Sequence, residues 1–394
     1  MEKRVAIIGA GMSGLLACKY ILEKGFDPIV FEATESVGGL WKHTIESTKL
    51  QNAKESYQFS DLPRRRSVSS HTEALEYLES YACHFGIIPY IKFHSRVVSI
   101  DYIGEPYAEM ESWDLWGGTG KPFGSRGKWH IRVQDSKCCS TEVHQVEFVV
   151  LCIGRFRGVP NIPEFPPNQG PEMFSGKVIQ VSAAELIRRK RIAIVGSQKT
   201  ALYIAAECAN ANELLVHKPS ETFLLKFLAT ILSHLRWGIS KFAESYLRWK
   251  LPLKKYGLWN LRVNNLSAIF KKQIVHPQIP QLAIIGYAEG FSGLIGFEVR
   301  SQWLAHFLDG KVALPSIKEM EKDVIVWENS MKQYAGRYLQ RSCLGSIYIW
   351  YNDQLCKDMG CEHKRKKGIF AEYFQPYEPA DYAGITSKRM MKTD

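Results

Sequence analysis

Three glycines near the N-terminus have the spacing of a phosphate-binding turn. Gly9, Gly11 and Gly14 match the pattern GxGxxG and follow the short apolar run Val5–Ile8. In such a turn the first glycine permits a tight chain reversal, the second lets the backbone approach a pyrophosphate, and the third lets a helix pack closely on the strand. The spacing therefore predicts a diphosphate group bound at a helix N-terminus, where backbone N–H groups lack intrahelical partners.

The residues after this turn complete a βαβ unit. An apolar helical pattern ends at Gly25, and a second apolar run, Pro28–Phe31, leads directly into Glu32. An acid at this place can accept hydrogen bonds from ribose hydroxyls and would repel a 2′-phosphate. The first site is therefore predicted to bind FAD or NAD rather than NADP.

A pair of glycines lies a few residues beyond the acid, in the run Ser36–Trp41. The pair is compatible with an ordinary surface turn, but it would also let the chain pass close to the diphosphate of the cofactor. With this run included, the residues predicted to contact the first cofactor are Gly9, Ala10, Gly11, Met12, Ser13, Gly14, Glu32, Gly39, Leu40 and Trp41.

A second, less regular glycine turn follows the apolar run Arg191–Val195. An ordinary strand–turn–helix is the alternative, because Gln198 replaces the second glycine and hinders close backbone approach. No acid stands in the ribose-binding position, whereas Lys199, His217 and Lys218 favour a 2′-phosphate and hence NADPH. The residues predicted to contact this second cofactor are Gly196, Ser197, Gln198, Lys199, Thr200 and Ala201.

The order of apolar runs and helical segments around the two glycine turns predicts an α/β fold with two Rossmann-like dinucleotide-binding domains. The apolar run Phe148–Cys152 ends at Gly154 and is followed by the proline-rich connection Val159–Pro167, which suits a domain crossover. We therefore expect a three-layer FAD-binding domain formed by residues 1–155 and 260–394. An NADPH-binding domain, residues 156–259, is inserted into it.

The composition agrees with a two-domain enzyme that binds phosphorylated ligands. The 394 residues carry a formal net charge of +11, a basic excess that suits polyanionic dinucleotides as well as a membrane or nucleic acid. Motifs of nucleic-acid readers are absent from the sequence, so we expect no nucleic-acid partner. The sequence contains no run of 18 apolar residues, so no membrane span is predicted and a cytoplasmic location is expected. The basic stretch that begins at Phe223–Trp237 leaves a peripheral membrane contact open.

The cysteines predict free thiols in a reducing compartment. There are 9 of them, an odd number, and no CxxC motif occurs. Cys356, Cys361 and His363 do not fit a standard zinc spacing, so no metal site is expected.

Several segments together resemble the flavin-containing monooxygenases, specifically a plant branch similar to pipecolate N-hydroxylase. The resemblance is carried by GAGMSG, FEATESVGGLWKHT, KLQNAKESYQFSDLP, VVLCIGRFRGVPNIPEFP and VGSQKTA. It implies FAD in the first site, NADPH in the second, and O₂-dependent oxygenation of a small amine or sulfide through a flavin C4a-hydroperoxide. It also implies that Asn52 lies near the reactive edge of the flavin, although Gln51 could fill the same place.

The sequence also departs from the pattern of this family. Gln180 stands where the family has His, and Ala184 stands where it has an aromatic residue. Segments are missing after Asn212, around Tyr256–Trp259 and before Arg191, which predicts internal deletions and an incomplete NADPH-binding domain. The alternative to a working enzyme is therefore a catalytically impaired FAD-binding remnant or splice form. A third reading is a flavoprotein that only passes electrons to O₂.

Overall fold

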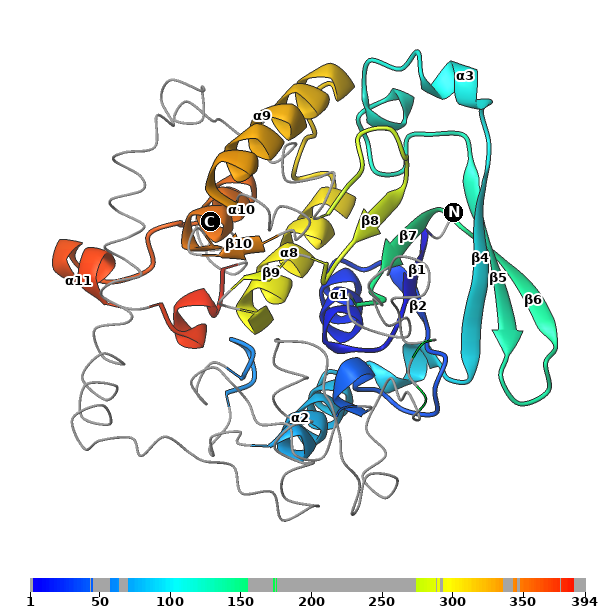
Figure 1. Ribbon diagram of the computed structural model, residues 1–394, viewed down its shortest axis with the longest axis horizontal. Helices are drawn as coiled ribbons and strands as arrows, with labels where there is room; N and C mark the ends of the chain where they lie inside the picture. Colours follow the sequence, from blue (N-terminus) through cyan, green and yellow to red (C-terminus); the bar gives the residue numbers. More distant parts are fainter. Residues whose placement is uncertain are drawn as a thin grey trace.

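A parallel β-sheet lies at the centre of the protein, between a layer of helices and a small antiparallel sheet (Figure 1). The structure is a computed structural model. It describes residues 3–42, 44, 57–63, 70–154, 173, 175, 274–287, 289–290, 293–335, 343–345, 348–375 and 377–385.

The parallel sheet has the strand order β3-β2-β1-β7-β8. In this order the strands comprise Ile91–Lys92, Asp27–Phe31, Arg4–Ile8, Phe148–Leu151 and Leu282–Ile284. Ile8 at the end of β1 lies opposite Phe31 on β2 and Leu151 on β7, so the three strands end at the same edge. Because both faces of this sheet are covered, β1 and β7 are apolar runs rather than alternating patterns.

Helix α1 (Met12–Glu23) follows β1 and covers one face of the sheet. Its buried side chains include Leu15, Leu16 and Ile21, as the helical pattern in the sequence predicts. The helix ends at Gly25, whose φ of 75° lies in the left-handed region and whose N–H donates to the carbonyl O of Leu22 at 2.9 Å.

Two further helices complete this layer. Helix α8 (Gly293–Leu308) packs against α1 and is buried almost all round, including Val299, Trp303 and Phe307. Helix α2 (His71–His84) begins with a capping box, in which the Ser70 hydroxyl accepts from the Glu73 N–H at 3.2 Å. The remaining elements of the described residues are η1 (Gly39–Lys42), η3 (Ile88–Tyr90), α3 (Tyr107–Met110), η4 (Trp116–Gly118), β9 (Glu289–Gly290), α9 (Ile317–Ala335), β10 (Cys343–Gly345), α10 (Tyr348–Asp358), α11 (Ile369–Phe374) and η8 (Pro379–Tyr382).

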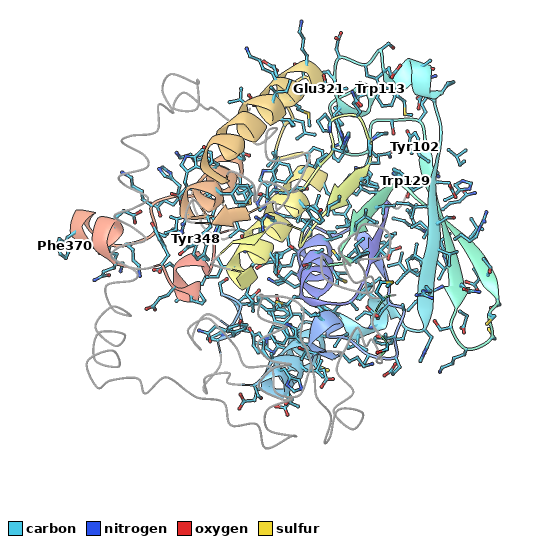
Figure 2. All side chains as sticks on the ribbon, in the orientation of Figure 1. Tyr102, Trp113, Trp129, Glu321, Tyr348 and Phe370 are labelled. Carbon is cyan, nitrogen blue, oxygen red and sulfur yellow. The ribbon has the colours of Figure 1, made fainter. Side chains whose placement is uncertain are left out.

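The opposite face of the parallel sheet is covered by an antiparallel sheet of β4 (Ser95–Ile103), β5 (Lys128–Asp135) and β6 (Thr141–Val146). Trp129 and Ile131 of β5 belong to the apolar cluster between the two sheets. The rings of Tyr102 and Trp129 lie 5.3 Å apart between their centroids (Figure 2), and the Trp129 indole donates to the carbonyl O of Pro280 at 3.2 Å. This bond ties the antiparallel layer to the chain that leads into β8.

The predicted α/β class, with a parallel sheet in a three-layer domain, is therefore confirmed. The predicted domain boundaries at 155/156 and 259/260 lie outside the described residues, as does most of the predicted NADPH-binding domain. The seven cysteines whose side chains the structure describes are free thiols. Within the described ranges, no helix is both long enough and apolar enough to cross a bilayer.

Gly14 is a position where the fold has no room for a side chain. A Cβ there would overlap the carbonyl O of Gly9 and lie 2.9 Å from its carbonyl C. We expect Gly14→Ala to lower the free energy of unfolding by about 3 kcal/mol, because α1 would have to move away from β1. Urea unfolding followed by circular dichroism measures the loss.

Gly25→Ala is the matched control for this measurement. A Cβ at Gly25 would meet no atom within 4 Å, so only the left-handed conformation opposes the substitution. That conformation costs about 1–2 kcal/mol for a non-glycine residue. Equal losses in the two variants would contradict the close packing of α1 on the glycine turn.

Candidate dinucleotide-binding site

The candidate site lies at the edge where the parallel strands end. The chain segments that leave β1, β2 and β7 stay in register there: the Gly9 N–H donates to the carbonyl O of Phe31 at 2.8 Å, and the Cys152 N–H donates to that of Ile8 at 2.9 Å. Strand order reverses between β1 and β7, because later strands are added on either side of β1. In doubly wound sheets ligands bind outside the carboxyl ends of the strands at such a reversal.

Gly9 and Gly14 are required by the fold itself. Gly9 has a φ of 104°, and a Cβ there would lie 2.6 Å from the carbonyl O of Cys152. Gly14 lies against the carbonyl of Gly9 in the same way. Both positions therefore bring the start of α1 onto the backbone that leaves β1 and β7.

Gly11 is different, because the described residues give no steric reason for a glycine there. It is the N-cap of α1 with an ordinary φ of −77°, and the atom nearest to a Cβ would be the Cα of Gly39 at 3.5 Å, a normal contact. No side chain caps the helix at this residue, so the first-turn N–H groups of α1 have no side-chain acceptor at the N-cap. A glycine and an uncapped helix start are both what a bound pyrophosphate needs.

Glu32 is buried, with 1% of its surface exposed, and its carboxylate fastens two loops of the site. One oxygen accepts from the Ala10 N–H at 2.8 Å, and the other accepts from the N–H and the hydroxyl of Thr34 at 2.9 and 2.8 Å. The sequence predicts Glu32 as an acceptor for ribose hydroxyls. It does not predict this second role, in which Glu32 holds the glycine turn beside the chain that leaves β2.

The glycine pair after Glu32 lies next to the turn, as the sequence predicts. The Gly38 N–H donates to the carbonyl O of Ala10 at 3.1 Å, and a Cβ at Gly39 would lie 3.0 Å from the Cα of Gly11. Leu40 is 49% exposed, and the ring of Trp41 meets that of Tyr57 edge-on at 6.0 Å. The structure therefore brings the predicted contact residues of the first site together.

Gly286 is a member of the site that the sequence analysis does not single out. It follows β8 with a φ of 96°, and a Cβ there would overlap the hydroxyl of Ser13 and lie 3.1 Å from its Cβ. The signal in the sequence is a glycine directly after the apolar run Leu282–Ile285, the same pattern that precedes Gly9.

The other predicted site residues lie outside the described residues. These are Asn52 with its alternative Gln51, and the second turn, Gly196 to Ala201. Their predicted contacts with the flavin edge and with NADPH therefore stay predictions.

Comparison with known proteins identifies relatives that cover almost the whole chain. Residues 2–230 match the family described as "Flavin-binding monooxygenase-like". The "Probable flavin-containing monooxygenase 1" of Arabidopsis thaliana is 31% identical over 97% of this chain and 96% of its own length. The "Putative flavin-containing monooxygenase 2" of the same plant is 32% identical over 91% of this chain and 97% of its own length. Among solved structures, the S-allyl-L-cysteine S-oxygenase from Allium sativum has the same fold, with a TM-score of 0.65 at 18% identity over 99% of this chain and 93% of that one.

The first alignment also shows how much this chain lacks. It extends over 514 positions, whereas 97% of the 394 residues is only about 382 residues. Roughly 130 positions of the alignment therefore have no residue of this chain. The alignment covers 96% of the relative, so the unmatched positions lie within it rather than beyond its ends. This agrees with internal deletions in the present chain.

The role of Glu32 in the loops can be tested by Glu32→Gln. In the variant an NH₂ group replaces one of the two carboxylate oxygens. The backbone N–H of either Ala10 or Thr34 then loses its acceptor. We expect the free energy of unfolding to fall by about 1–3 kcal/mol even in the absence of ligand. Glu35→Gln is the control, because its exposed carboxylate pairs with Lys42 at the surface and its loss should change stability by less than about 1 kcal/mol. A Glu32→Gln protein as stable as this control would show that the carboxylate does not hold the two loops.

Proposed function

The chain belongs to the flavin-binding monooxygenase-like family, and we propose on this premise that it oxygenates a soft nitrogen or sulfur atom of a small molecule. Membership makes it a flavin-dependent monooxygenase with FAD and NADPH as cofactors, as the sequence predicts. The class of substrate and the reaction that converts it are the proposed part.

The proposal depends on FAD binding, and the observation that supports FAD binding is the geometry around Gly11. An uncapped helix start, a glycine that the fold does not need, and the adjacent backbone of Gly39 form a cradle that a Cβ at Gly11 would fill. This cradle fits the diphosphate of FAD, because backbone N–H groups and the positive end of a helix bind phosphate oxygens. The residues present therefore fit the cofactor of the family.

The residues of the chain would bind and orient the cofactor. The first-turn N–H groups of Met12 and Ser13 would donate to the pyrophosphate, and Glu32 would accept from ribose hydroxyls. Gly39, Leu40 and Trp41, which follow the glycine pair beside the turn, would contact the same cofactor. When bound, the flavin supplies the transfer of electrons from NADPH to O₂, and the protein supplies orientation and exclusion of water.

The shortened part of the chain favours a second candidate, an impaired FAD-binding form of the enzyme. Roughly 130 alignment positions without a residue of this chain are a large loss for an enzyme that needs two nucleotide sites. The predicted contacts with the FAD diphosphate come from the described first site, whereas turnover would also need the predicted NADPH contacts of residues 196–201.

Anaerobic reduction followed by O₂ separates these candidates. We expect the purified yellow protein to be bleached by NADPH without O₂, and the flavin absorbance to return with oxygenated product once O₂ and an amine or sulfide are added. A flavin that NADPH does not bleach would contradict the proposal and support the impaired form. Bleaching that ends only in peroxide release would support a flavoprotein that passes electrons to O₂.

Gly11→Ala tests the FAD site directly. The fold tolerates a Cβ at this position, so we expect a loss of stability of only about 1 kcal/mol, the usual difference between Gly and Ala at an N-cap. The new methyl group occupies the place of the pyrophosphate, so we expect at least a tenfold weaker retention of FAD. Absorbance at the flavin band after gel filtration measures it, and Gly11→Leu should abolish it. FAD retention equal to that of the unchanged protein would show that the first site is wrongly assigned.

A further inference from the structure

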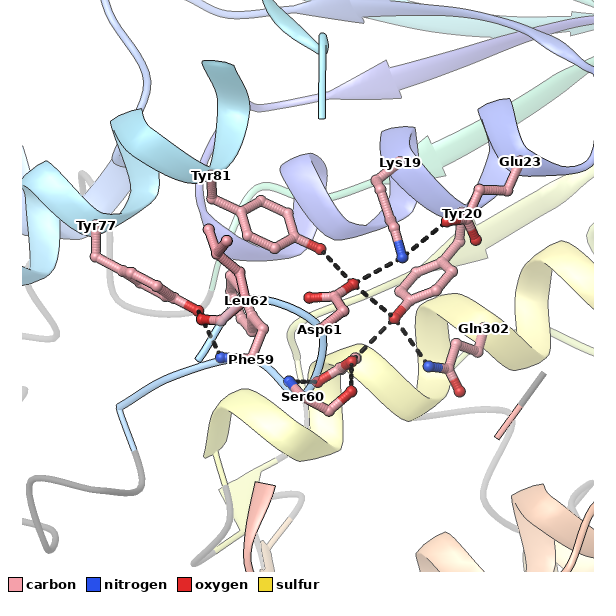
Figure 3. Close-up of polar contacts among 11 residues, drawn as sticks. Lys19, Tyr20, Glu23, Phe59, Ser60, Asp61, Leu62, Tyr77, Tyr81 and Gln302 are labelled. Carbon is pink, nitrogen blue, oxygen red and sulfur yellow. Dashed lines mark hydrogen bonds and ion pairs between the residues drawn. The ribbon is translucent and has the colours of Figure 1, made fainter. Parts of the chain in front are cut away.

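A buried network of polar side chains joins α1, α2 and α8 to the short segment Phe59–Leu62 (Figure 3). We call this segment the 59–62 strap. It follows the predicted flavin-edge residue Asn52 in the sequence, and its main partner, Glu298 on α8, has 0% of its surface exposed. The first site does not use this network.

The strap is bonded to three helices. The Ser60 N–H donates to Glu298 Oε2 at 3.0 Å, and the Ser60 hydroxyl contacts Glu298 Oε1. The Phe59 N–H donates to the Tyr77 hydroxyl of α2 at 2.7 Å, and that hydroxyl donates to the carbonyl O of Leu62 at 2.9 Å. Both ends of the strap are therefore held by Tyr77 of α2, and its middle is held by Glu298 of α8.

Asp61 supplies the contact with α1. Its Oδ2 accepts from Lys19 Nζ at 2.7 Å and from the Tyr81 hydroxyl at 3.2 Å. The carboxylate of Asp61 is thus compensated by a cation. Among the described residues no Lys or Arg forms an ion pair with Glu298, although Glu298 is the more deeply buried acid.

The hydroxyl of Tyr20 on α1 lies between these two carboxyl groups. Its oxygen is 2.9 Å from Glu298 Oε1 and 3.3 Å from Asp61 Oδ2, and it accepts from Gln302 Nε2 at 2.8 Å. A tyrosine has one hydroxyl hydrogen, so it cannot donate to both acids. A proton on Glu298 removes the conflict: Glu298 donates to Tyr20, and Tyr20 donates to Asp61.

We propose that Glu298 is a positioning residue that carries a proton in the folded protein, and that this proton holds the 59–62 strap against the FAD-binding helix α1. The arrangement gives Tyr20 two hydrogen bonds to accept and one to donate, which uses its full capacity. It also leaves the negative charge of Asp61 next to the Lys19 cation, which forms a second ion pair with Glu23 at 2.9 Å on the exposed side of the helix.

The electrostatics of the pocket favour the same state. Burial and, after it, the nearby charge of Asp61 raise the pKa of Glu298 from 4.5 to about 7. The folded protein therefore binds a proton that the unfolded chain releases near pH 4.5. The stability contributed by this proton is present below that pH and is lost as the pH rises through about 7.

Infrared spectroscopy of Glu298→Gln tests the proton itself. Asp358 is a second buried acid, whose pKa burial raises to about 8, so Asp358→Asn is the matched control. We expect the unchanged protein at pH 6 to show C=O stretches that include those of protonated Glu298 and protonated Asp358. Glu298→Gln should lose the one that titrates near 7, and Asp358→Asn should lose the other. Identical carboxyl bands in Glu298→Gln and the unchanged protein would overturn the proposal.

Hydrogen exchange tests the positioning. After correction for intrinsic rates, we expect protection of the strap amides to fall by up to about tenfold per pH unit between pH 4.5 and 7 and to level off above 7, because opening releases the Glu298 proton only in that interval. Glu298→Gln keeps the donor and acceptor of the protonated acid, so it should fold and keep strap protection constant from pH 5 to 7. The same pH slope in both proteins would overturn the proposal.

This inference rests on the proposed function only in taking α1 as the FAD-binding helix, and neither measurement requires turnover. If the protein is catalytically active but lacks the Glu298 carboxyl band, only the inference about the 59–62 strap is contradicted. A protein that shows the band and the exchange slope but retains no FAD contradicts the proposed function alone.

Discussion

The structure depends on one close approach between backbones. The start of α1 lies directly on the carbonyl groups of Gly9 and Cys152, where β1 and β7 end, and no side chain fits between them. Because α1 is seated there, its N-terminus faces the carboxyl edge of the sheet, and the loops that carry Glu32, Gly39 and Gly286 surround it. The same seat places the far end of α1, with Lys19 and Tyr20, against α8 and the 59–62 strap. One contact therefore orients both the candidate site and the buried network.

The sequence predicts the first βαβ unit well because each of its signals is local. Apolar runs identify β1 and β2, and Gly25 ends α1 through its left-handed conformation. The antiparallel layer is not predicted, because its cover of the sheet depends on Trp129 and Ile131 meeting residues far away in the chain. Helix α8 gives no periodic signal either, because it is buried almost all round and its buried residues include the polar Glu298, Arg300 and Gln302 beside apolar ones.

The candidate site shows the same division. The spacing of Gly9, Gly11 and Gly14 predicts the turn, but only the structure separates the two glycines that the fold needs from the one that it does not. Likewise, the sequence identifies Glu32 as an acid in the right place, whereas its bonds to Ala10 and Thr34 depend on how two loops meet. The partnership of Tyr20 and Glu298 joins residues 278 positions apart, and no local pattern could indicate it.

The place of β8 bears on how the chain tolerates its missing segments. β8 forms the edge of the sheet by pairing with β7, although more than a hundred residues separate the two strands in the sequence. The entropy lost on closing such a loop grows only with the logarithm of its length, about 0.6 kcal/mol for each doubling. The entropic cost of closing the central sheet therefore depends only weakly on how many residues lie between β7 and β8. A chain with many tens of residues fewer between these two strands would close the same sheet at a similar entropic cost.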